Sequence, residues 1–123
     1  MVHELSAALA DYLSELHRLS QAQATVLSAD VATALGVSKA SACRATDSLC
    51  ALGYIQKQRY VKGITLTTQG RAYAEFLTER RAVIAAFLQK TLRLEVELAQ
   101  RDAKTIAHGL SEKAFLTMCL SLN

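Results

Sequence analysis

The sequence predicts a mainly α-helical fold with one small β-hairpin, a winged helix-turn-helix followed by a helical dimerisation region. Two observations predict it. The first half runs helix, short capped helix, glycine-bearing turn, second helix and two short strands, which is the order of that motif. After the strands, apolar residues keep a helical period for about 25 residues. With 123 residues and no proline, we expect two parts, 1–70 and 71–123.

The expected elements of the first part follow from periodicity and capping residues. Apolar residues at three- and four-residue steps predict a helix over 4–20, before a polar loop at 20–25. Ser28 is expected to cap a short helix ending at Gly36, and Ser38 a second helix, 39–52, ending at Gly53. The apolar stripe of the second helix is expected to contain Ala42, Ala45, Leu49 and Leu52.

A hairpin is expected to end the first part, and the second part is expected to hold three helices. Segments YIQKQ and ITLT predict the strands of a hairpin, joined by the basic turn RYVKG. Thr67 or Thr68 then opens a helix to about residue 92, which is longer than a small core needs. A further helix covers about 95–108, and Ser111 caps a final, apolar one. These features predict a homodimer.

Charge is unevenly distributed in a chain of net charge +3. Between residues 39 and 71, Asp47 is the one acid, and the bases are Lys39, Arg44, Lys57, Arg59, Lys62 and Arg71. Such a local basic stretch favours a surface that binds a polyanion, and double-stranded DNA is the expected partner. A merely solvated surface is the alternative.

The second helix of the motif is expected to place its amino-terminal turn in the major groove. Free backbone N–H groups there suit a phosphate, and long cationic side chains reach phosphates or guanine edges. The expected DNA-binding residues are Ser38, Lys39, Ser41, Arg44 and Ser48 on this helix and Arg59, Tyr60 and Lys62 at the hairpin tip. Alternatives are an ion pair of Arg44 with Asp47, packing of Tyr60 against the hairpin, and a motif that binds protein instead of DNA.

Other classes of protein are disfavoured. No apolar stretch of 18 residues and no signal-like leader occurs, so we expect a cytoplasmic protein without a membrane partner. Three cysteines at no zinc-like spacing are expected to be free thiols. No histidine has a nucleophile at suggestive spacing, and no glycine-rich phosphate loop is present, so we do not expect an enzyme.

The segments ALADYLSELHRLS, VATALGVSKASACRATDSLCALGYI and KGITLTTQGRAYAEFL resemble the iron- and manganese-dependent repressors, the diphtheria-toxin-repressor and manganese-transport-regulator family. The likeness covers nearly the whole chain and fits the short form, without the extra C-terminal domain of longer members. It implies a transcriptional repressor. Lys39 and Ala40 stand where the family often has prolines, and the hairpin is about one residue longer, so the operator sequence is not carried over.

The resemblance also implies a metal site, and this sequence departs from it. Asp11 matches a ligand of the family, and His108 matches another. Ser14 stands where a glutamate or methionine is usual, and Arg81 and Lys104 replace a histidine and a carboxylate or cysteine. Two ligands beside two cations are too few for manganese or iron. We therefore expect no cofactor, with a repressor that uses manganese or iron at an altered site as the alternative.

One hypothesis follows from these replacements. Lys104 or Arg81 pairs with Asp11 and supplies the positive charge permanently, so that the protein binds DNA without a metal. The alternative for His108 is a hydrogen-bonded residue between helices.

Overall fold

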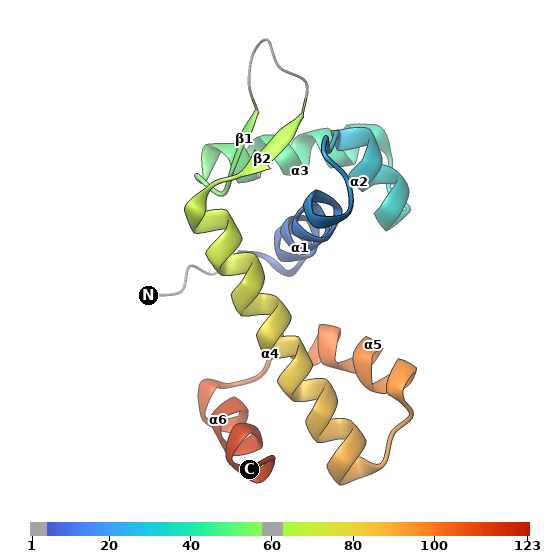
Figure 1. Ribbon diagram of the computed structural model, residues 1–123, viewed down its shortest axis with the longest axis vertical. Helices are drawn as coiled ribbons and strands as arrows, with labels where there is room; N and C mark the ends of the chain where they lie inside the picture. The colour runs from blue at the N-terminus through green and yellow to red at the C-terminus, as the bar shows by residue number, and fades with distance from the viewer. Residues whose placement is uncertain (1–4, 58–62) are drawn as a thin grey trace. The chain divides into compact units, whose positions relative to one another are not determined.

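The computed structural model describes residues 5–57 and 63–123 and confirms the predicted fold class (Figure 1). The helices are α1 (Ala7–Ala22), α2 (Ser28–Leu35), α3 (Lys39–Ala51), α4 (Thr68–Leu92), α5 (Val96–Ile106) and α6 (Glu112–Ser121), and the strands are β1 (Ile55–Lys57) and β2 (Ile64–Leu66). The chain divides into two compact units, Met1–Glu75 and Phe76–Asn123. Among the described helices, none is long and apolar enough to cross a membrane.

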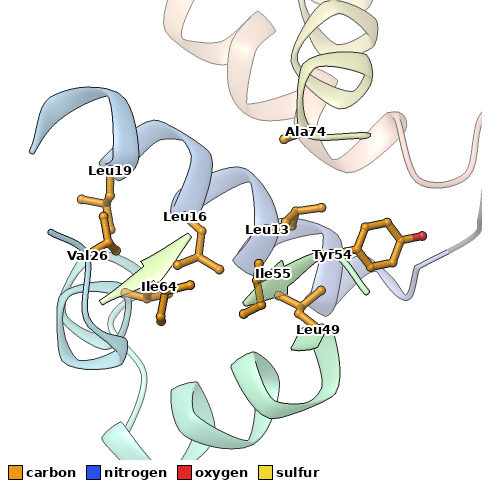
Figure 2. Close-up of a cluster of buried hydrophobic side chains, with 10 residues drawn as sticks. Leu13, Leu16, Leu19, Val26, Leu49, Tyr54, Ile55, Ile64 and Ala74 are labelled. Atoms are coloured by element: carbon orange, nitrogen blue, oxygen red, sulfur yellow. The ribbon is translucent and has the colours of Figure 1, made fainter. Parts of the chain in front are cut away.

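The core of the first unit is formed by α1, the hairpin and α3. Figure 2 shows Leu13, Leu16 and Leu19 of α1 beside the hairpin residues Ile55 and Ile64, with Leu49 of α3 on the other side. Leu13 and Leu49 are fully buried. Burial of each such side chain stabilises the fold by about 1.5–3 kcal/mol, so this cluster fixes the helices of the motif.

The hairpin is antiparallel and attached to the rest of the unit through backbone groups. Ile55 lies opposite Leu66, and Lys57 lies opposite Ile64. The Ile64 N–H donates to the carbonyl oxygen of Val26 at 2.8 Å, which joins β2 to the segment before α2. The position of β1, and therefore of Lys57, is thus fixed relative to the helices.

The start of α4 lies against the end of α3 and β1. The Thr67 hydroxyl accepts the Gly70 N–H at 3.0 Å and donates to the Gly53 carbonyl oxygen at 2.7 Å. A Cβ atom at Gly70 would lie 1.9 Å from the Tyr54 carbonyl oxygen. Glycine is therefore the residue that lets these two backbone segments approach so closely.

The second unit has a small core with a buried cation beside it. The core residues are Ile84, Ala85, Leu88, Ala99 and Ala103. Arg80 is 8% exposed, and its Nη1 lies 3.1 Å from Glu112 Oε1. The Arg80 guanidinium carbon also lies 4.2 Å from the Phe115 ring centroid, within the range of a cation–π interaction. These contacts attach α6 to α4.

Several sequence-based expectations need correction. Ser28 is the first residue of α2, not its cap; the Asp30 carboxylate accepts the Leu27 N–H at 2.8 Å instead. Helix α1 extends into the start of the expected loop and ends at Ala22. Leu52 is 52% exposed, because α3 ends at Ala51 and the chain turns away at Gly53 with φ of 87°. The expected caps Ser38 and Ser111 are confirmed.

Changing Gly70 to alanine is expected to destabilise the first unit. The added methyl group would overlap the Tyr54 backbone, and relieving that overlap costs about 3 kcal/mol of the free energy of unfolding. Urea unfolding followed by circular dichroism measures it. Gly109→Ala is the matched control, because nothing lies within 4 Å of its added Cβ. Equal stability of the two variants would contradict the close approach at Gly70.

Candidate nucleic-acid interface

Helix α3 has one buried and one exposed face. Its buried side chains are Ala42, Ala45, Thr46 and Leu49, and the Thr46 hydroxyl lies 3.3 Å from that of Ser28 on α2. Its exposed residues include Lys39, Ala40, Arg44, Asp47 and Ser48. The short inner side chains let α3 pack closely on α2. The other face is left to solvent or a partner.

The amino-terminal turn of α3 carries a network of short polar side chains. Ser38 caps the helix, its Oγ accepting the Ser41 N–H at 3.0 Å, and its hydroxyl donates to Ser41 Oγ at 2.9 Å. Arg44 Nη2 donates to the same Ser41 oxygen at 3.3 Å. This network directs the guanidinium toward the start of the helix, where free N–H groups and the helix dipole also favour an anion.

The alternative of an ion pair between Arg44 and Asp47 is wrong in this structure. Lys57 of β1 lies 2.7 Å from Asp47 Oδ1. Among described residues Arg44 forms no ion pair, so its charge is directed outward. Lys39 is exposed in the first turn as well.

Most of the expected helix residues are exposed on the first unit. Ser38, Lys39, Arg44 and Ser48 are exposed, and Ser41 is half-buried. The expected hairpin-tip residues, Arg59, Tyr60 and Lys62, lie outside the described residues. Sequence reasoning did not include Lys57 and Asp47 among the site residues. Their opposite charges, ten positions apart, were the available signal, but pairing them requires the placement of β1 beside α3.

The residues matched to the family's metal site do not fit a manganese or iron site of that type. Asp11 belongs to α1 of the first unit, and Arg81, Lys104 and His108 belong to the second. Within each unit, the described residues form no group of three or more His, Cys, Asp or Glu side chains that could hold a metal ion. Ser14 offers one neutral hydroxyl, which is a poor substitute for a carboxylate.

His108 lies in a turn and not within a helix. The expected helix over 95–108 ends at Ile106, and the His108 N–H donates to the Thr105 carbonyl oxygen at 3.3 Å. The residue is exposed, as is Lys104. The direction of the imidazole is therefore set by the turn between α5 and α6, and not by its position in a helix.

Comparison with known proteins relates the chain to transcriptional regulators. Residues 67–123 match the family model of the iron-dependent repressor metal-binding and dimerisation domain. An uncharacterised HTH-type transcriptional regulator of Methanocaldococcus jannaschii is 26% identical over 110 residues, covering 89% of this chain and 87% of that protein. The HTH-type transcriptional regulator MntR of Lysinibacillus sphaericus is 27% identical over 101 residues, covering 82% of this chain and 71% of MntR.

Solved structures agree on the fold. The manganese regulator SloR superposes with a TM-score of 0.81 at 22% sequence identity, over 94% of this chain and 53% of SloR. This chain thus spans about half the length of that regulator. The likeness therefore concerns the fold of this chain.

Proposed function

We propose that this chain is a DNA-binding transcriptional repressor related to the iron-dependent repressors, whose metal-binding and dimerisation domain residues 67–123 match. It acts as a homodimer and needs no metal at the family's usual site. Ser38, Lys39, Ser41, Arg44 and Ser48 contact the DNA, together with Arg59, Tyr60 and Lys62 of the hairpin tip. It is not an enzyme, and its place of action is the cytoplasm.

One observation carries the proposal: α3 is held by its inner face and presents cations on its outer face. Buried Thr46 and Leu49 fix the helix, while Arg44 and Lys39 are exposed without an ion pair among the described residues. Exposed cations beside the amino terminus of a helix favour a polyanion as the partner. Phosphate contacts release counterions, so affinity should fall steeply with salt.

Changing Arg44 to alanine is expected to weaken binding to duplex DNA about tenfold and to lower the slope of log affinity against log salt by about one. The lost guanidinium is directed toward the start of α3, where a phosphate or guanine would lie. Fluorescence anisotropy at several salt concentrations measures both quantities.

Arg101→Ala is the matched control. It removes the same charge from an exposed position on α5, where Nε lies 4.0 Å from Asp102 Oδ1. Equal losses of DNA affinity in the two variants would show that the Arg44 effect comes from net charge alone. No DNA binding by the unchanged protein at any salt concentration would favour a protein-interaction module with this fold.

The homodimer is supported by apolar side chains of the second unit that face solvent. Leu120 is 74% exposed and Leu116 is 53% exposed on α6, one turn apart. The same unit has an open groove of about 440 Å³, lined by Phe87, Ser111, Lys113, Ala114, Thr117 and Met118. The matching family model is described as a dimerisation domain. Apolar surface of this kind on a small protein is typical of an interface.

Changing Leu120 to aspartate is expected to shift the protein from dimer to monomer, because the carboxylate would be desolvated in the interface. Sedimentation velocity at several concentrations measures the distribution. Leu52→Asp is the control, since Leu52 is 52% exposed in the first unit. If the Leu120→Asp protein stays dimeric, α6 does not form the dimer interface.

Metal independence follows from the donor set. Asp11 and His108 are two donors, and the matched positions 81 and 104 carry an arginine and a lysine. Manganese and iron need more oxygen or nitrogen ligands than these provide. The pairing of Asp11 with Lys104 or Arg81, which would supply the positive charge in place of a metal, stays a prediction.

Selection of genomic fragments by the protein, run in parallel with EDTA and with manganese or iron, is expected to recover the same sites. Isothermal titration with manganese provides an independent measure of metal binding. Sites recovered only with metal, together with a measurable heat of binding, would show that ligands come from elsewhere and that the alternative of a metal-dependent repressor holds.

A further inference from the structure

An exposed carboxylate lies on the outer face of α3 among cations, where DNA phosphates would repel it. We propose that Asp47 is a specificity-determining residue that accepts a hydrogen bond from the exocyclic amino group of a base, cytosine above all, in the major groove. This inference rests on the proposed function and adds to it the recognition of one specific base. Asp47 is the one acid of α3, and it is exposed.

The position of Asp47 on the helix places it in line with Arg44. Residues 40, 44, 47 and 51 are spaced four, three and four apart, so they form one stripe, and all four are exposed. Arg44 and Asp47 are separated by about 4.5 Å along the helix axis, comparable to the spacing of stacked base pairs. The two side chains can therefore address neighbouring base pairs.

The Asp47 side chain is 72% exposed, and its contact uses one oxygen only. Lys57 lies 2.7 Å from Oδ1. Among described residues, Oδ2 has no hydrogen-bond partner, so it can accept one from DNA. The Lys57 ammonium partly offsets the carboxylate charge and holds the side chain in place. This support explains how an acid is tolerated on such a surface.

The chemistry of the groove decides which base fits. A carboxylate is an acceptor only, so it suits the N4 amino group of cytosine and repels O6 and N7 of guanine and O4 of thymine. Adenine offers its N6 amino group next to the acceptor N7, which makes it a weaker partner for a carboxylate. Asp47 thus gains specificity partly by rejecting the wrong bases.

Selection from randomised duplexes with the 123-residue chain tests the proposal. We expect the unchanged protein to enrich cytosine at one position of each half-site. Asp47→Ala should lower the preference for cytosine about tenfold, which is the effect expected from the loss of one good base contact. It should also bind non-specific DNA more tightly, because a negative charge has been removed. Asp47→Asn should shift the preference to adenine, whose N6 and N7 an amide binds together.

Two further variants separate base reading from simpler effects. Glu75→Ala removes an exposed acid from α4 of the same unit and should leave the base preference unchanged. Lys57→Ala should weaken binding and, because Asp47 loses its support, should lower the cytosine preference less than Asp47→Ala does. If Asp47→Ala and Lys57→Ala instead lower affinity equally and neither alters base preference, Asp47 only tethers β1 and the proposal is overturned. Failure of the unchanged protein to bind any duplex would overturn the proposed function itself, which is a different outcome.

Discussion

The burial of one face of α3 is the constraint on which the rest of the first unit depends. Alanines at 42 and 45 and a threonine at 46 bring α3 close to α2, and Leu49 joins the core formed with α1 and the hairpin. Small side chains at a helix contact permit short interaxial distances. Because this face is fixed, the direction of every outward side chain on α3 is fixed as well. The charged surface is thus a consequence of packing on its opposite side.

Much of this arrangement could be predicted from the sequence because it rests on local signals. Ser38 and Ser111 are caps as expected, and Gly36 ends α2 in the left-handed conformation with φ of 67°. The long helix begins at Thr68, one of the two expected residues. Each of these depends on a few neighbouring positions, where backbone hydrogen bonding decides the outcome. The resemblance to the repressor family agrees with the same elements.

The features that could not be predicted depend on contacts between distant residues or on competing local ones. Ser28 and Asp30 both offer a side chain to the start of α2, and the carboxylate forms the bond. The pair of Asp47 and Lys57 requires the hairpin to lie beside α3. Arg80, enclosed by Phe115 and Glu112, depends on how α6 folds back on α4. Periodicity alone gives none of these, because it describes one segment at a time.

For the proposed homodimer, the composition of the second core has a consequence for how the protein responds to its own concentration. Three of its five clustered residues are alanines, Ala85, Ala99 and Ala103, beside Ile84 and Leu88. Alanines bury little apolar area, so this unit gains little hydrophobic free energy by itself. If its exposed leucines are covered only on association, folding of the unit and dimerisation are linked by mass action. Synthesis rate would then set not only how much protein is present but what fraction of it is folded.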